Sequence, residues 1–188
     1  MKIFGKKGIE KRFRFNQAAA DGFDDYIFGQ TKEPVSELKY GSLNKKISSV
    51  GCGVAAIYNV MRCIGNSQSF AEVLRDAELL RLPFCGGFFG TKTKKLGRYF
   101  KLHGVNFTKF RSCQKFKEAM PDCQIAIVCS WNDKITGGIH FYCIVPDGED
   151  KYNSINYYSS DCMREFSLDA IRDDRFIITY CFKKRLAH

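Results

Sequence analysis

Several signatures are missing from this chain of 188 residues, and each absence narrows the class of protein it can be. No run approaches the roughly 20 apolar residues of a membrane helix, so no membrane span is expected. The basic N-terminus lacks the apolar segment of a secretory signal, which predicts a cytoplasmic protein. The chain also lacks internal repeats and low-complexity segments. With 45% apolar residues, its length suits one well-cored domain.

Cysteine is abundant, but the spacings typical of disulfide frameworks and zinc sites are absent. The nine cysteines are odd in number and include no CxxC pair, and only three histidines accompany them. Several lie in apolar runs, where a free cysteine behaves as a buried hydrophobic residue. This spacing fits neither a disulfide framework nor a zinc site, so no metal and no cofactor are expected.

Two clusters of basic residues contribute to the net charge of +10. Their members are Lys2, Lys6, Lys7, Lys11, Arg12 and Arg14 in the first, and Lys92, Lys94, Lys95, Arg98 and Lys101 in the second. Such clusters attract anionic partners, and an acidic peptide substrate is compatible with them. Because no RNA- or DNA-binding motif accompanies them, no specific nucleic-acid partner is expected.

The order of periodic segments predicts the fold class. Residues 1–40 are expected to form a basic N-terminal arm with a short helix at 16–28, and residues 41–188 the main domain. Further helices are predicted at 52–64, 69–80 and 91–103, the last capped by Thr91. Strands are predicted at 105–110, 124–130, 138–145, 151–158 and 176–182, with short helical pieces at 114–120 and 168–172. Helices followed by a largely antiparallel sheet define an α+β fold.

Cys52 is the strongest candidate for chemistry. It begins the predicted helix 52–64, where unpaired N–H groups and the helix dipole favour a thiolate. Gly51 and Gly53 flank it, which would let a substrate backbone approach and leave the thiol unshielded. The N–H of Cys52 would point toward a developing oxyanion. These features indicate a nucleophile rather than a buried structural cysteine.

A nucleophilic thiol needs a histidine to take its proton. His188 is the last residue, and His103 ends a predicted helix, where a histidine has an ordinary role. His140 lies on the predicted strand 138–145 and is the candidate base.

The hairpin that follows His140 supplies a candidate orienting residue. If its turn is centred on Gly148, Asn156 lies directly opposite His140, and its side-chain oxygen can accept the ring N–H. Asn153, the alternative, then faces the other side of the sheet.

The Gly- and Phe-rich loop at 84–91 is a candidate wall of a substrate groove. Gly86, Gly87, Gly90 and Thr91 are its candidate contact residues. A packed hydrophobic turn explains the same composition equally well.

Three segments together resemble the bacterial papain-like peptidases that process double-glycine leader peptides, and their stand-alone relatives. GCGVAAIYNVMRCIG resembles the family's nucleophile helix, with a Cys-Gly-x-Ala-Ala pattern that begins at Cys52. GTKTKKLGRYFKLHGVNF resembles its Gly-Thr-opened helix, and GGIHFYCIV followed by INYYS resembles its histidine strand and return strand. The matches span about residues 44 to 160.

The resemblance implies a papain-like α+β domain whose nucleophile helix packs on a mainly antiparallel sheet. It implies a bacterial cysteine peptidase that cleaves a peptide or amide bond through a thioester. Cys52 would be the nucleophile, His140 the base and then the acid, and Asn156 the orienting residue.

One departure from the family's pattern concerns the oxyanion hole. Members have a glutamine six positions before the cysteine, whereas this chain has Lys46. Asn44, Ser48 and Ser49 are the candidate replacement donors. Two alternatives stay open: a deamidase, transglutaminase or acyltransferase that uses the same three residues, and a catalytically weak module that binds a peptide.

Overall fold

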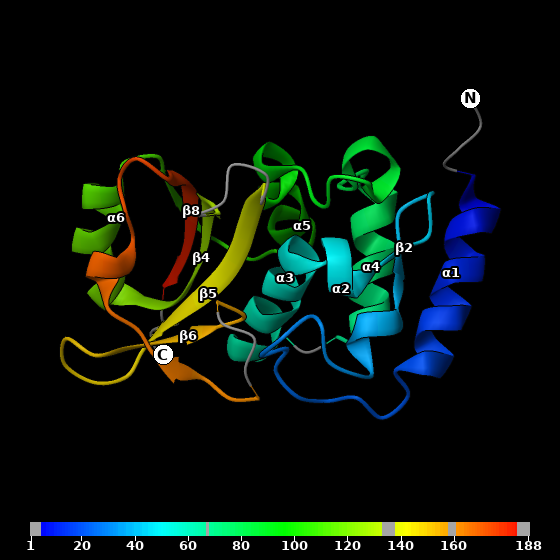
Figure 1. Cartoon of the computed structure of the whole chain (residues 1–188), viewed down its shortest axis with the longest axis horizontal. Helices are drawn as coiled ribbons and strands as arrows, with labels where there is room; N and C mark the ends of the chain where they lie inside the picture. The colour runs from blue at the N-terminus through cyan, green and yellow to red at the C-terminus, as the bar shows by residue number, and fades with distance from the viewer. Residues whose placement is uncertain (1–4, 67, 133–137, 158–160, 184–188) are drawn as a thin grey trace.

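The computed structural model describes residues 5–66, 68–132, 138–157 and 161–183. Figure 1 shows a helical half followed by a sheet, with α1 at one end of the molecule and α6 at the opposite end. The sheet is six-stranded and antiparallel throughout, which confirms the predicted α+β fold. Lys2 and His188 lie outside the described residues.

The helical elements are mostly short. The α-helices are α1 Lys6–Ala19, α2 Ile47–Val50, α3 Cys52–Cys63, α4 Phe70–Leu79, α5 Gly97–Leu102 and α6 Cys113–Ala119. The 3-10 turns are η1 Val35–Glu37, η2 Phe84–Gly87, η3 Thr93–Lys95, η4 Met120–Asp122 and η5 Leu168–Ala170. Ser69 and Glu72 form the predicted capping box at the start of α4, each side chain bonded to the other's backbone N–H.

Two helix predictions are wrong. The arm's helix is α1 rather than 16–28, because Gly22, with a φ of 72°, and the turns after it interrupt that stretch. Thr91 does not cap a helix: it is buried, pairs with Pro83 in an isolated β-bridge and contacts the Tyr40 hydroxyl. Helical structure begins only at Thr93.

The six-stranded sheet has the order β3-β8-β4-β5-β6-β7. Its strands are β3 Thr108–Phe110, β4 Cys123–Trp131, β5 Ile139–Pro146, β6 Tyr152–Ile155, β7 Arg164–Glu165 and β8 Phe176–Lys183. A separate pair consists of β1 Lys39–Tyr40 and β2 Lys45–Lys46. The predicted strands 105–110 and 151–158 are shorter than expected. Asn156 ends the second of them by adopting a φ of 62°, which a strand does not allow.

Successive side chains of the central strands point to opposite faces of the sheet, and α3 packs on one of these faces. Phe141 and Cys143 of β5 belong to the core that contains α3, whereas Tyr142 and Ile144 belong to the core that contains α6. The start of α3 therefore packs on the Phe141 face of β5, whereas His140 lies on the same face as Tyr142 and lines a cavity with it.

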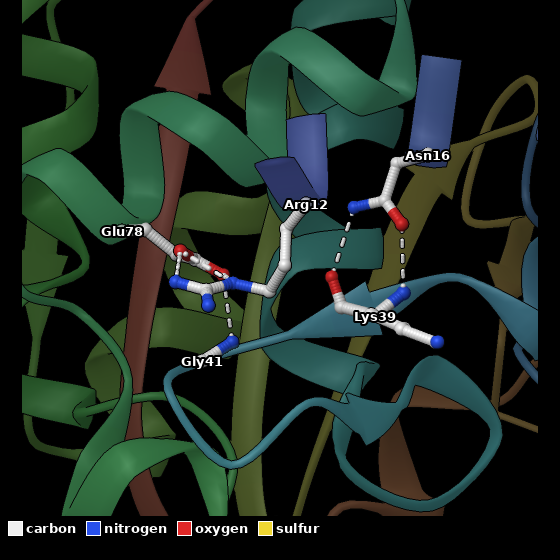
Figure 2. Close-up of polar contacts among 5 residues, drawn as sticks. All are labelled: Arg12, Asn16, Lys39, Gly41 and Glu78. Carbon is white, nitrogen blue, oxygen red and sulfur yellow. Dashed lines mark hydrogen bonds and ion pairs between the residues drawn. The ribbon is translucent and has the colours of Figure 1, made fainter. Parts of the chain in front are cut away.

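The contacts in Figure 2 join α1 to α4 and to β1. Arg12 of α1 donates to both carboxylate oxygens of Glu78 of α4, at 2.9 and 3.0 Å from its Nε, and Glu78 accepts the Gly41 N–H at 2.7 Å. Asn16 pairs with Lys39 through both backbone groups, at 2.8 and 2.9 Å. Glu78 is 2% exposed, so its charge depends on these partners.

Within the described ranges, no helix is long and apolar enough to cross a membrane. The same residues contain no group of three or more histidine, cysteine or carboxylate side chains that could hold a metal ion.

Candidate active site

Cys52 is the first residue of α3. Gly51 before it has a φ of −88° and a ψ of −3°, so that α2 leads almost directly into α3. Gly51 has no side chain that could cap the helix. The first backbone N–H groups of α3 are therefore available as hydrogen-bond donors to the Cys52 sulfur.

The two glycines beside Cys52 are explained by internal packing. A Cβ on Gly51 would lie 2.4 Å from the Ile47 side chain, and one on Gly53 would lie 2.6 Å from Thr91. Internal packing therefore already requires glycine at both positions, and the approach of a substrate backbone beside them stays a prediction.

The Cys52 thiol is half-buried and touches the strand that carries His140. Burial raises the pKa of Cys52 above its ordinary value. The backbone N–H groups of Phe141, Gly53 and Cys52, in that order of size, oppose this rise. Phe141 directly follows His140, so the sulfur sits against the backbone beside the candidate base.

His140 lies opposite Ser130 near the start of β5. Its Nε2 is 2.5 Å from the backbone carbonyl oxygen of Asn156 and must therefore carry a proton. In the neutral ring, Nδ1 is then left as an acceptor. Burial lowers the pKa of His140, and the bond to the Asn156 carbonyl opposes this shift. His103, by contrast, pairs with Asp76 at 3.3 Å.

Asn156 reaches His140 through its main chain, not its side chain, which corrects the sequence prediction. Cys143 pairs with Ile155, a register shifted by two residues from the predicted one. The shift keeps Asn156 on the face of His140 but no longer directly opposite it. Beyond Ile155 the positive φ of Asn156 turns its carbonyl toward the imidazole.

The Asn156 side chain instead binds Gln30 of the N-terminal arm. Its Oδ1 accepts the Gln30 backbone N–H at 3.1 Å, and its Nδ2 donates to Gln30 Oε1 at 3.4 Å. Gln30 Nε2 also donates to the backbone carbonyl of Ser48, at 3.2 Å. Gln30 thus links the segment before Cys52 to the residue that binds His140.

The candidate oxyanion donors occupy different places. Asn44 is exposed at the β1–β2 turn, and Lys46 pairs with Glu37 at 2.6 Å. Ser48 contributes its carbonyl to Gln30. Only Ser49 of the three candidates lines the same cavity as Cys52, and its hydroxyl donates to the Lys46 carbonyl at 2.9 Å.

An apolar cavity of about 370 Å³ lies beside Cys52. Its walls include four aromatic side chains that are each 47–59% exposed: Phe84, Phe88, Phe89 and Trp131. Gly90 and Thr91 also line it. Gly86 and Gly87 lie behind it against the 40–43 segment, where a Cβ on either would come within 2.8 Å of that segment.

Cys52 and His140 line two neighbouring cavities that share Trp131. Ile139 and Phe141 line the first with Cys52, and Tyr142 lines the second, of about 230 Å³, with His140. Among the described residues, the sulfur and the imidazole are not hydrogen-bonded to each other. An extended ligand that ran from one cavity to the other past Trp131 would contact both the Cys52 sulfur and the His140 imidazole.

No protein-family model matches the sequence, and no curated protein matches it. Among solved structures, the chain is similar to the peptidase domain of Streptococcus ComA, described as a bi-functional ABC transporter involved in a quorum sensing pathway. The TM-score is 0.51 at 13% identity, over 71% of this chain and 91% of that one. It also matches a double glycine motif protease from an AMS/PCAT transporter, with a TM-score of 0.49, 14% identity and coverage of 71% and 84%. The fold is therefore that of a papain-like cysteine peptidase domain, as the sequence resemblance implies.

Two residues of the site were not predicted from the sequence. Gln30 lies in a turn-rich stretch without a motif, and its contact with Asn156 spans 126 positions of the chain. Trp131 is the only tryptophan of the chain and is 56% exposed at the end of β4. An exposed tryptophan is a signal for a binding surface, but the composition gives only its presence and not its exposure.

Proposed function

We propose that this protein hydrolyses a peptide or amide bond through a thioester on Cys52. The observation that carries the proposal is the position of Cys52: it begins α3 and lines an apolar groove together with Phe141, the residue that follows His140. The papain-like fold supports the proposal.

The two pKa shifts favour a neutral thiol and a neutral imidazole at rest. A raised pKa keeps Cys52 protonated, and a lowered pKa keeps His140 unprotonated, at neutral pH. His140 would therefore act as a general base during attack rather than hold a standing ion pair. Nδ1 must then reach the sulfur in the substrate complex, where catalytic hydrogen bonds tighten.

In the proposed reaction, the sulfur attacks the carbonyl carbon while the thiol proton passes to His140 Nδ1. The imidazolium returns this proton to the leaving amine as the carbon–nitrogen bond breaks, leaving a thioester. His140 then takes a proton from water, whose oxygen attacks the thioester carbon. As the carbon–sulfur bond breaks, the imidazolium returns the proton to the Cys52 sulfur and the carboxylic acid is released. Asn156 holds Nε2 through its carbonyl throughout.

The developing oxyanion would accept one hydrogen bond from the backbone N–H of Cys52 and another from a second donor. Ser49 is the candidate, because it lines the Cys52 cavity and its hydroxyl can rotate away from the Lys46 carbonyl. Loss of one such donor typically lowers kcat by about 10²–10³-fold. Ser49→Ala tests this role.

Mass spectrometry of the acyl-enzyme tests the proposed function. The protein is mixed with a diverse peptide pool and quenched in acid, and adducts at Cys52 are sought that hydroxylamine removes. Turnover with the adduct is expected in the wild type and in Cys162→Ala, whose thiol is exposed elsewhere. Cys52→Ala should abolish both.

The outcomes separate the alternatives. Turnover that releases ammonia, or that transfers the acyl group to an added amine instead of water, indicates a deamidase or acyltransferase on the same residues. Saturable peptide binding without an adduct or turnover contradicts hydrolysis and leaves a peptide-binding module. The missing hydrogen bond between Cys52 and His140 is the observation that favours this second candidate.

A further inference from the structure

One long segment of the chain contains basic residues and no acidic residue. Between Glu78 and Glu118 the sequence contains ten basic residues and no acidic residue, a charge equal to the net +10 of the whole chain. A segment of this kind keeps a positive potential unless acids from other elements neutralise it.

Four of these cations converge on one cavity that is separate from the groove beside Cys52. The cavity measures about 510 Å³ and lies between η3, α5, β3 and β8. Its charged lining residues are Lys94, Arg98, Lys101 and Lys109, all of them exposed. Asn106 adds an exposed amide.

Within the described part of the chain, none of the four cations forms an ion pair. The carboxylate of Asp76, which interacts with Tyr99 of α5, is already paired with Arg75 and His103. The pKa of Lys95, which neighbours this cavity in sequence, is lowered chiefly by the charge of Lys92 and further by Arg98. This shift indicates a local positive field that no acid offsets.

The floor of the cavity is rigid. Phe107 packs against Tyr180 with ring centroids 5.3 Å apart, and the Tyr180 hydroxyl donates to the Thr93 carbonyl at 2.8 Å. A Cβ on Gly97 would lie 2.7 Å from the Phe107 ring, so α5 is pressed onto this floor. The backbone that presents the cations is therefore fixed before any ligand arrives, which lowers the entropic cost of binding.

We propose that this cavity binds a small organic or inorganic polyanion that carries two or more linked phosphates. Lysine and arginine side chains with a neutral amide donor are the groups that bind phosphate oxygens in proteins. A cavity of this volume falls in the range of small-molecule sites, roughly 300–1,000 Å³. Its two aromatic lining residues, Phe107 and Tyr180, are packed against each other, so among the described residues it presents no free aromatic pair of the kind on which single-stranded nucleic acid stacks.

Calorimetric titration with tripolyphosphate, at about 0.1 M salt where distant charges are screened, tests the proposal. Saturable one-site binding is expected, with a nucleoside triphosphate binding comparably. The double variant Arg98→Gln/Lys101→Gln should raise Kd at least about tenfold, since two direct charge contacts are lost. The matched control Lys11→Gln/Arg14→Gln removes the same charge from the exposed face of α1 and should change Kd less than about twofold.

Three results would overturn the proposal. The first is the absence of saturable binding with about 1 mM tripolyphosphate. The second is an equal loss in the two double variants, which would show diffuse attraction rather than a site. The third is tighter binding of a decaglutamate peptide than of tripolyphosphate, which would assign the cavity to an acidic peptide. Thermal unfolding of each variant establishes that a lost signal does not come from a lost fold.

Discussion

His140 and Asn156 are joined by a bond of 2.5 Å from the imidazole Nε2 to the main-chain carbonyl oxygen. A side-chain substitution at Asn156 cannot remove this acceptor. The orientation of His140 therefore depends on the backbone path of residue 156, which its φ of 62° and the contacts with Gln30 maintain.

Asn156→Gly removes the side chain while permitting the positive φ. Because the carbonyl acceptor remains, we expect kcat/KM to fall by only about tenfold, far less than in His140→Ala, where loss of a general base typically costs about 10²–10⁴-fold. In Asn156→Ala, kcat/KM should fall further, because an alanine held at this positive φ is strained by roughly 1–2 kcal/mol. A glycine variant as inactive as His140→Ala would show that the side chain itself orients the ring.

Gln30 should act as a positioning residue for the same bond. Gln30→Met removes the side-chain contacts with Asn156 and Ser48, whereas Gln30→Glu keeps an acceptor for Asn156 Nδ2. We expect Gln30→Met to lower kcat about tenfold with little change in KM. The kcat of Gln30→Glu should lie between those of Gln30→Met and the wild type. Equal activity and equal pH profiles in all three proteins would restrict Gln30 to a structural role.

The resting protonation states predict the pH dependence. Because the pKa of Cys52 is raised, the rate of its alkylation by iodoacetamide should climb about tenfold per pH unit between pH 6 and 8. Because the pKa of His140 is lowered, the acidic limb of kcat/KM should lie below about pH 6.5, the ordinary value for histidine. A flat alkylation rate across this range that vanishes in His140→Ala would indicate a standing ion pair instead.

The aromatic wall should govern substrate affinity. Trp131→Ala removes the side chain shared by the two cavities, and we expect KM to rise at least about fivefold with the acyl-enzyme still formed on Cys52. Leu102→Ala, at an exposed apolar position outside both cavities, is the matched control. Similar KM values in both variants would contradict a substrate path past Trp131.

The contacts in Figure 2 should contribute to stability more than to chemistry. Arg12→Met leaves the buried Glu78 without its charge partner, and breaking such a pair typically costs about 3–5 kcal/mol. Urea unfolding measures this loss, and Arg12→Met/Glu78→Met should recover a large part of it. A single variant as stable as the wild type would show that Glu78 is satisfied without Arg12.

The sequence by itself determined the order of elements and the two candidate catalytic side chains. A helix that begins at Cys52 and a strand that contains His140 follow from local periodicity and end signals, which depend on residues near in the chain. The resemblance to papain-like peptidases added the packing of that helix on the sheet, and the structure has the same arrangement.

Only the tertiary structure decided how those side chains are held. The register of β5 with β6 depends on turn geometry, and a shift of two residues moved Asn156 from direct pairing to a carbonyl contact. Gln30 meets Asn156 because the segment after α1 runs to the end of β6, a contact between distant residues that no local pattern encodes. The cation-lined cavity likewise forms only when α5 packs on β3 and β8, since neighbours in sequence alone do not define a concave surface.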